Sequence, residues 1–312
     1  IRCPSARGPR ASRGWVTSPA ARTGWRCEVV SSGSVALKSP IPYFGGKTRM
    51  AKRLIDLMPA HQHYVEPFAG SLAVLLAKPP ANHETVNDLD GDLMNFWRVL
   101  RDHATEFERV CALTPHSRAE QQAAYESTDD PIERARRVWV QLSQGRAGVR
   151  TKTGWRHYVD PAGSVSSMPR YLKGYVGRMA PAVERLARVS LECLPALDVI
   201  AKYGKSPEVC LYVDPPYLGS TRSSGGYVHE MRGDTEHADL LSALLTCKAS
   251  VVLSGYPSDL YDTELVEGAG WDRMEIATAT GQGGEWQERT EVIWSNRALN
   301  TQQAFDLEET AS

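Results

Sequence analysis

The chain has 312 residues, with 36 Lys and Arg against 37 Asp and Glu, and 42% hydrophobic residues. These values are ordinary for a globular protein with one large domain, or with a core that carries an inserted module. No apolar run approaches the roughly 18 residues of a membrane-spanning helix, and the net charge of -1 gives no overall sign of a polyanionic partner. Six scattered cysteines without a C-x-x-C spacing argue against a zinc site or a disulfide framework, and they favour a reducing cytoplasm.

The first 38 residues differ in composition from the rest of the chain. They contain six arginines and one lysine but a single acid, Glu28, and they show no apolar periodicity. We expect this Arg- and Ser-rich segment to be disordered. Its composition resembles an organellar transit peptide, and the alternative, which Ile1 as first residue favours, is upstream sequence translated ahead of the true start.

From Ser39 onward the apolar spacing predicts regular elements. In chain order we expect a helix at 49–58, a strand at 64–66, a helix at 72–77, a strand at 84–87 and helices at 92–101, 118–125, 132–142 and 182–189, with little periodicity at 145–177. The alternation then resumes with a strand at 190–193, a helix at 196–203, a strand at 209–213, a helix at 236–246, a strand at 250–254, and a hairpin-like pair of strands at 271–277 and 290–294. Alternating strands and helices predict an α/β fold with a parallel, doubly wound sheet, in which residues 102–188 form an insertion.

The segment Glu66–Ser71 follows a predicted strand and precedes a predicted helix. Such a turn can present backbone N–H groups and a helix N-terminus to a ligand. The segment lacks the G-x-G-x-x-G pattern of dinucleotide sites, and its one glycine, Gly70, suits a smaller ligand that carries a carboxylate and a sulfonium. An ordinary strand-to-helix turn is the alternative interpretation.

Two further segments complete a candidate cofactor site. Asp88 ends the next predicted strand at about 20 residues from Gly70, an offset at which an acid typically accepts hydrogen bonds from ribose hydroxyls. Asp90 and Asp92 are expected to cap the following helix instead. In the turn Pro42–Lys47, the aromatic residue could pack on a ring and the lysine could complement a carboxylate.

The tetrapeptide Asp214–Tyr217 comes directly after an apolar run. Its first proline has no N–H, and the residue before each proline is extended, so Asp214 should project from the strand end. Open α/β sheets bind their ligands at that end. A carboxylate, two prolines and an aromatic ring suit the binding of a flat ring with an exocyclic amino group, and a Pro-Pro turn that ends a strand is the alternative.

A strongly basic stretch lies between these motifs. From Arg134 to Arg188 there are twelve Lys and Arg but only two acids, with Trp139, Trp155, Tyr158, Tyr171 and Tyr175 interleaved. Cations with planar rings suit contact with phosphates and unstacked bases. The alternative is a solvated basic face, which is plausible for the helical part of the stretch. The candidate nucleic-acid contacts are Arg146, Arg150, Lys152, Arg156, Arg170, Lys173 and Arg178.

Taken in this order, the motifs resemble the DNA adenine-N6 methyltransferase family, in the class whose cofactor motifs come first, followed by a target-recognition domain and the catalytic motif. The resemblance covers about residues 39–297 and rests on Pro42–Lys47, Glu66–Ser71, Asp88 and Asp214–Tyr217. The second of these has one glycine where many members have two. The resemblance implies a doubly wound, Rossmann-like methyltransferase sheet with an inserted, mainly helical target-recognition domain.

The resemblance also implies an activity, the transfer of a methyl group from S-adenosyl-L-methionine to N6 of a flipped-out adenine in double-stranded DNA, without a metal. Catalysis would fall to Asp214, Pro215, Pro216 and Tyr217. Cofactor binding would fall to Tyr43, Phe44, Gly45, Lys47, Glu66, Pro67, Phe68, Ala69, Gly70, Ser71, Asp88 and Asp214. DNA binding would fall to the seven basic residues named above.

Several expectations complete the sequence-based interpretation. The catalytic domain would comprise residues 39–101 and 189–297, with the insertion at 102–188 and a tail at 298–312, in a cytoplasmic monomer or weak dimer from a restriction–modification system or a phage. We expect residues 220–230 to close over the flipped base and Ser254–Tyr256 to line its pocket or simply end a strand. Surface or packing roles are expected for His61, His63, His157 and His229.

Three other functions are alternatives for this sequence. Glutamine and RNA-base methyltransferases use the same cofactor, but the glutamine enzymes typically carry Asn at the position of Asp214, and N4-cytosine enzymes carry Ser, so the residue favours adenine. The non-enzymatic alternative is a catalytically degraded prophage copy that only binds DNA. A nicotinamide dehydrogenase fits poorly without the dinucleotide pattern.

Overall fold

The computed structural model describes residues 36–157, 167–218, 228, 229, 231, 233–282 and 285–299, without the side chains of 279–288. Nearly all of the predicted N-terminal segment and C-terminal tail lies outside these residues, as does most of the expected closing segment 220–230. Seven strands form one sheet in the order β3-β2-β1-β4-β5-β7-β6. Their bounds are β1 His63–Glu66, β2 His83–Asn87, β3 Ser190–Glu192, β4 Val209–Val213, β5 Ser250–Gly255, β6 Asp272–Gln282 and β7 Glu285–Ser295.

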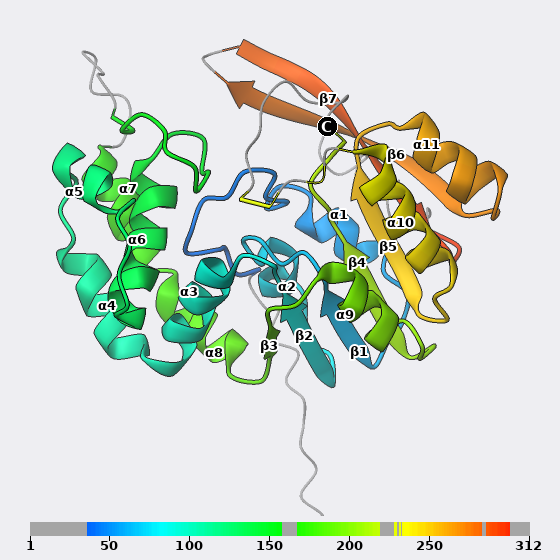
Figure 1. Ribbon diagram of the computed structural model, residues 1–312, viewed down its shortest axis with the longest axis horizontal. Coiled ribbons are helices and arrows are strands. Elements are labelled where there is room, and N and C mark those ends of the chain that lie inside the picture. The colour runs from blue at the N-terminus through cyan, green and yellow to red at the C-terminus, as the bar shows by residue number, and fades with distance from the viewer. Residues whose placement is uncertain are drawn as a thin grey trace, which may run out of the picture. The chain divides into compact units, whose positions relative to one another are not determined.

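Strands β1 to β5 pair in parallel, and β7 runs antiparallel to both β5 and β6. The helices of the described chain are α1 Ala51–Asp56, α2 Ala73–Ala77, α3 Gly91–Asp102, α4 Ala104–Leu113, α5 Arg118–Ala123, α6 Pro131–Gln144, α7 Met168–Val176, α8 Met179–Leu186, α9 Ala196–Tyr203, α10 Asp234–Leu245 and α11 Asp259–Tyr261, which continues as a π-helix over Asp262–Glu267. The predicted doubly wound α/β fold with a C-terminal hairpin is therefore confirmed (Figure 1).

The central strand β4 shows why this sheet is covered on both faces. All five of its residues are buried, and successive side chains point to opposite faces of a strand. Val209, Leu211 and Val213 pack in a cluster with α9 and α10, whereas Cys210 and Tyr212 pack in the cluster that contains α1, α2 and α3. A run that is apolar at every position is typical of parallel strands buried between two helical layers.

The strand order reverses between β1 and β4. From β1 the chain continues outward to β2 and β3, and from β4 it continues in the other direction to β5. Loops that leave adjacent strands in opposite directions open a crevice at the carboxyl ends, which is where doubly wound sheets bind ligands. The two candidate motifs Glu66–Ser71 and Asp214–Tyr217 lie at the ends of these two strands.

Helices α4 to α8 lie between β2 and β3 in the chain, and two of them are absent from the sequence-based expectation. The helix α4 buries only Phe107 and Cys111, and α7 contains Pro169 and Gly174. Buried side chains of this segment, such as Trp139, belong to the same hydrophobic cluster as those of the sheet. The helical segment therefore shares its core with the sheet instead of closing one of its own, and its boundaries at 102 and 188 stay a prediction.

Candidate active site

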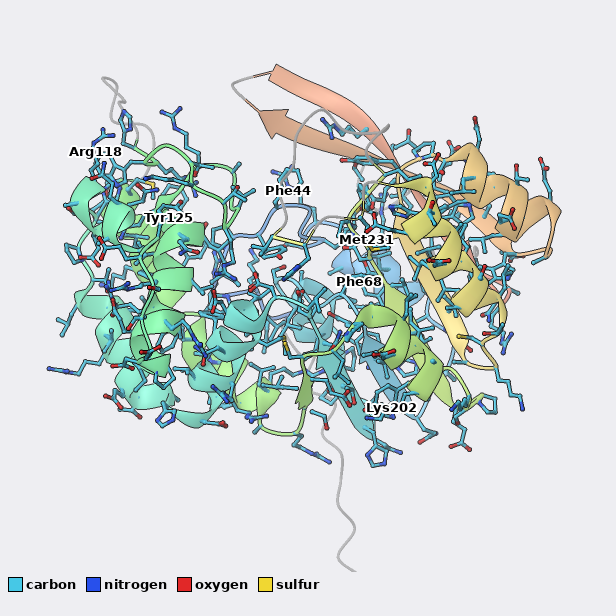
Figure 2. The ribbon with its side chains drawn as sticks, in the orientation of Figure 1. Phe44, Phe68, Arg118, Tyr125, Lys202 and Met231 are labelled. Atoms are coloured by element: carbon cyan, nitrogen blue, oxygen red, sulfur yellow. The ribbon has the colours of Figure 1, made fainter. Side chains whose placement is uncertain are left out.

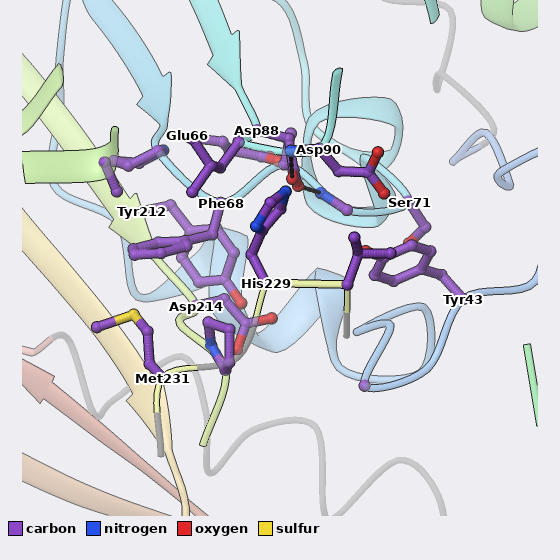
Figure 3. A pocket seen from close by; sticks show the side chains of 18 of the residues that line it. Tyr43, Glu66, Phe68, Ser71, Asp88, Asp90, Tyr212, Asp214, His229 and Met231 are labelled. Carbon is purple, nitrogen blue, oxygen red and sulfur yellow. Dashed lines mark hydrogen bonds between the residues drawn. The ribbon is translucent and has the colours of Figure 1, made fainter. Parts of the chain in front are cut away.

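A cavity of about 540 Å³ opens at the carboxyl ends of β1 and β4. All twelve residues that the sequence proposes for cofactor binding line it (Figure 3). Its acidic side chains come from four segments and are Glu66, Asp88, Asp90, Asp214, Glu236 and Asp239, and among the described lining residues only Lys47 is a permanent cation. We call this space the acidic cavity, and its charge favours a cationic ligand.

Glycine is required in the first strand-end loop because of Tyr43. Gly70 has φ +48°, a conformation that side chains disfavour, and a Cβ there would lie 3.1 Å from the Tyr43 ring. The tyrosine ring thus packs directly on the backbone of the loop. The sequence suggests that backbone N–H groups of this turn face a ligand. The N–H of Gly70 instead donates to Asp88 at 3.0 Å, so this amide stabilises the loop itself.

Asp88 joins the ends of β1 and β2. Its carboxylate accepts the N–H groups of Gly70 and Asp90, each at 3.0 Å, and burial raises the pKa of Asp88 to about 6. The neighbouring Asn87 donates to the carbonyls of Pro67 and Leu194. Asp90 accepts the N–H groups of Asp92 and Leu93 and so caps α3, as predicted.

Glu66 is a buried carboxyl group in the floor of the acidic cavity. It accepts hydrogen bonds from the Tyr64 hydroxyl at 2.7 Å and from the N–H of Leu75 at 2.9 Å. Desolvation outweighs both bonds and raises the pKa of Glu66 to about 8. The group is therefore predominantly protonated at neutral pH.

Lys47 lies at the centre of a buried polar network. Its ammonium donates to the two oxygens of Asp214 at 2.7 and 2.9 Å and to the hydroxyl of Tyr217, and it lies 3.3 Å from Glu291 on β7. Tyr217 in turn donates to Glu291. Burial raises the pKa of Glu291, although Lys47 counteracts this effect. The carboxylate that Lys47 complements is thus that of Asp214, within the protein.

Residues at the end of β5 complete the surroundings of the tetrapeptide. Ser254 donates to Asp214 at 3.0 Å, and the rings of Tyr217 and Tyr256 meet edge to face at 4.4 Å between centroids. Of the two prolines, Pro216 lines the acidic cavity. The side chain of Asp214 is therefore held by the turn that carries Lys47 and by β5, and it faces the cavity (Figure 3).

A second cavity of about 870 Å³ meets the first at the segment 43–47 and at Ser71. It contains Tyr217 and Tyr256, residues of α1, and residues of the β6–β7 hairpin. Its basic residues are Lys38, Lys47, Arg49, Arg53, Arg178 and Arg289, and its one described acid is Glu291. We call it the basic groove. The two adjoining spaces therefore carry opposite charge.

The seven candidate DNA contacts differ in their exposure and in their partners. Arg146, Lys152, Arg170 and Lys173 are exposed, whereas Arg156 and Arg178 are partly buried beside tyrosine rings. The Arg150 side chain is 9% exposed and pairs with Asp90 and Asp92. Because these two acids already neutralise it inside the protein, Arg150 is not available to a phosphate, and we remove it from the candidate DNA surface.

The aromatic residues of the basic stretch also differ from the expectation. Trp139 is fully buried in the core. Trp155 stacks between His116 and His157, with ring centroids at 4.4 and 5.4 Å. Tyr158 lies outside the described residues. Trp155 also lies beside Arg118, at 5.0 Å, and the two tyrosines of α7 lie beside Arg156 and Arg178.

Several lining residues were not found from the sequence. His229, for which a surface or packing role was expected, lines the acidic cavity and lies near Asp88 (Figure 3). Pro195, Leu197, Glu236 and Asp239 reach the cavity from the loops and helices after β3 and β4. Their positions depend on the crossover connections, which no local motif encodes. Among the described residues, no cluster of His, Cys, Asp and Glu could hold a metal ion, and no helix is long and apolar enough to cross a bilayer.

Comparison with solved structures gives matches of low similarity. A methyltransferase from Geobacter sulfurreducens is 11% identical, with 83% of this chain and 81% of that chain covered and a TM-score of 0.33. A SAM-dependent methyltransferase from Agrobacterium tumefaciens is 14% identical, with 80% and 61% covered and a TM-score of 0.34. A precorrin 8W decarboxylase from Methanobacterium thermoautotrophicum is 8% identical, with 84% and 96% covered and a TM-score of 0.35.

No curated protein has a sequence that matches the chain. A family model does match, and its range begins at Tyr43 of the first motif, includes Glu66–Ser71 and Asp88, and ends within α6. The resemblance seen in the sequence is thereby confirmed for the motifs that precede the basic stretch. Over residues 43–135 the chain matches the family of D12 class N6 adenine-specific DNA methyltransferases.

Proposed function

We propose that the protein transfers a methyl group from S-adenosyl-L-methionine to N6 of an adenine that is flipped out of double-stranded DNA. The observation that carries this proposal is the position of Asp214–Tyr217 at the junction of the two cavities. Asp214 and Pro216 face the acidic cavity, and Tyr217 faces the basic groove. A group held at this junction would meet a cation from one side and a polyanion from the other.

The acidic cavity suits the proposed cofactor. Six carboxyl groups, of which Glu66 is mostly protonated at neutral pH, surround a space into which Phe68 also projects, so a cationic sulfonium and a purine ring would both find partners (Figure 3). Asp88 is placed to accept hydrogen bonds from ribose hydroxyls, as an acid after the second strand typically does. When bound, this cofactor would supply an electrophilic methyl group.

The protein's own task is to position and activate a weak nucleophile. The lone pair of adenine N6 is delocalised into the ring. A hydrogen bond from N6 to Asp214, with a second to the carbonyl of Pro215, would favour a pyramidal nitrogen and stabilise the positive charge that develops on it. Base flipping costs about a few kcal/mol, and stacking on Tyr217 could return about 1–3 kcal/mol of it.

Lys47 competes with the target base in this arrangement. Both oxygens of Asp214 accept hydrogen bonds from the lysine ammonium, so the amino group of adenine would compete with it for the lone pairs of the carboxylate. Glu291 lies 3.3 Å from the same ammonium and offers an alternative partner. We therefore propose that Lys47 occupies the place of the target amine until the base arrives, and then shifts toward Glu291.

The test is the substitution Asp214→Ala with DNA from expressing cells analysed by single-molecule sequencing. We expect methylation to fall on the order of 100-fold or more, because the variant lacks the acceptor for N6, while cofactor binding measured by calorimetry is largely kept. Asp129→Ala, which removes an exposed acid just before α6, serves as the control. Undiminished methylation by the Asp214 variant would refute the assigned role, and the sequencing also reads the modified base and its context.

A further inference from the structure

We infer that the basic groove binds the phosphodiester backbone of the DNA strand that carries the target base. This inference rests on the proposed function and adds a DNA contact surface, on α1 and the β6–β7 hairpin, to the one expected in the segment 146–178. Besides Lys47, which pairs with Asp214, five basic side chains line the groove, and its one described acid, Glu291, is buried and already bonded to Tyr217. A space with this balance of charge favours a polyanion.

Two arginines of the groove lie over aromatic rings. Arg178 lies over the Tyr175 ring at 5.0 Å and donates to the carbonyl of Ser39, and Arg289 lies over the Tyr256 ring at 5.6 Å and donates to its hydroxyl. Neither pairs with a carboxylate of the described residues, so within that part of the chain their positive charge is uncompensated. Part of each guanidinium's set of donors stays available to phosphate oxygens.

Two half-buried arginines elsewhere are neutralised instead. Arg136 pairs with Glu120 and Glu133, and Arg185 pairs with Glu84. Among the described residues, Arg178 and Arg289 differ from these two because they contact rings and polar oxygens but no carboxylate.

The groove also has the geometry to lead a strand to the catalytic tetrapeptide. Arg53 comes from α1, Arg178 follows α7, and Arg289 lies on β7, so three separate elements supply charge. Tyr217 and Lys47 lie in the same groove and touch Asp214. A backbone held by the arginines would carry its extruded base toward Tyr217, and Tyr256 offers a ring on which a neighbouring base could stack.

The experiment compares two double variants of the full chain in salt-dependent binding to duplex DNA. Arg53→Gln with Arg289→Gln removes two charges from the groove. Lys202→Gln within α9 and Lys205→Gln just after it remove two exposed charges, and Lys202 lies at the opposite end of the strands from Phe44 (Figure 2). We expect the groove variant to bind DNA about tenfold more weakly near physiological salt and to lose about one unit of the log–log salt slope per charge. The control should keep the wild-type slope, and both should bind S-adenosylmethionine equally well.

Additional variants and binding measurements decide how the result is interpreted. Arg289→Lys should recover part of the slope, because it restores charge without the planar guanidinium. Equal slopes for the groove variant and the control, or a loss of slope only when Arg146, Lys152 and Arg170 are neutralised, would overturn the inference. Tighter groove-dependent binding to RNA than to duplex DNA would overturn the assigned partner. A wild-type protein that binds DNA through the groove but methylates no adenine would refute the proposed function while still supporting the groove as a surface that binds the DNA backbone.

Discussion

At the scale of single residues, Asp214 shows how one carboxylate is prepared for a substrate. Its oxygens accept hydrogen bonds from Lys47 and from Ser254, so the group is solvated by the protein before any ligand arrives. Preorganised partners of this kind lower the reorganisation that a reaction requires. In the proposed reaction the same partners are competitors, because a target amine would compete with the lysine for the lone pairs of the carboxylate.

Glu291 determines how easily Lys47 is displaced. In Glu291→Gln the ammonium of Lys47 loses its second anionic neighbour and should pair more tightly with Asp214. We expect kcat to fall about tenfold or more, as for other lost charge-assisted contacts, while the Kd for S-adenosylmethionine is unchanged. Stopped-flow measurement of base flipping with a fluorescent adenine analogue would check this, since an unaltered flipping rate and kcat would contradict it.

Glu66 makes stability depend on pH. Its pKa rises from the usual 4.5 to about 8 in the native state, so between these values the native protein holds a proton that the unfolded chain releases. The free energy of unfolding therefore falls as pH rises, by up to about 1.4 kcal/mol per pH unit from this group, and the loss is complete above pH 8.

The substitution Glu66→Gln should remove that dependence, since a neutral amide can still accept from Tyr64 and Leu75. We expect the free energy of unfolding, measured in urea, to rise for the variant relative to the wild type as the pH is raised from 5 to 8. Parallel pH profiles of the two proteins would show that the carboxyl group is not protonated in the native state.

At the scale of elements, the loop after β1 is built around contact between Gly70 and the Tyr43 ring. In Gly70→Ala the new methyl group would press on the ring at 3.1 Å, and the backbone φ of +48° would add strain of about 1–2 kcal/mol. We expect lower thermal stability and weaker cofactor binding, because Tyr43 lines the acidic cavity.

Gly174 provides the matched control for that substitution. It lies within α7 with nothing within 4 Å of a Cβ placed on it. Gly174→Ala should be neutral or stabilising by up to about 1 kcal/mol, since alanine is the better helix former. Differential scanning calorimetry and cofactor titration of both variants would test the comparison, and equal effects at the two positions would contradict it.

The elements also show what the sequence could predict. The strands β1 to β5 were predicted nearly to the residue because their apolar runs are short and bounded by Gly, Pro or Asp. The helix α4 was not, since only Phe107 and Cys111 mark its buried face. The site residues next to strand ends were all brought together. Glu291 was missed because it is one carboxylate in the alternating pattern of β7, and its burial depends on Lys47 and Tyr217 from distant segments.

At the scale of the whole molecule, a net charge of -1 conceals two adjoining spaces of opposite sign. This partition predicts different responses to salt. Raising the salt from about 50 to 200 mM should weaken DNA binding by orders of magnitude if several phosphates are contacted. The Kd for S-adenosylmethionine should change little, because its close, partly buried charges are screened much less. Calorimetric titrations at both salt concentrations would test this, and equal salt dependence would contradict a separation of the two ligands.

The N–H of Phe44 donates to the carbonyl of Gly148 at 2.9 Å, and a Cβ on that glycine would lie 3.3 Å from the backbone of Tyr43. The turn that borders both spaces is therefore fastened to the chain just beyond α6. Any rearrangement of this turn when DNA binds would change the acidic cavity and so the affinity for the cofactor. Thermodynamic linkage requires cofactor binding to change the affinity for DNA by the same factor. The two ligands should accordingly bind with cooperativity, each altering the affinity of the other by the same factor.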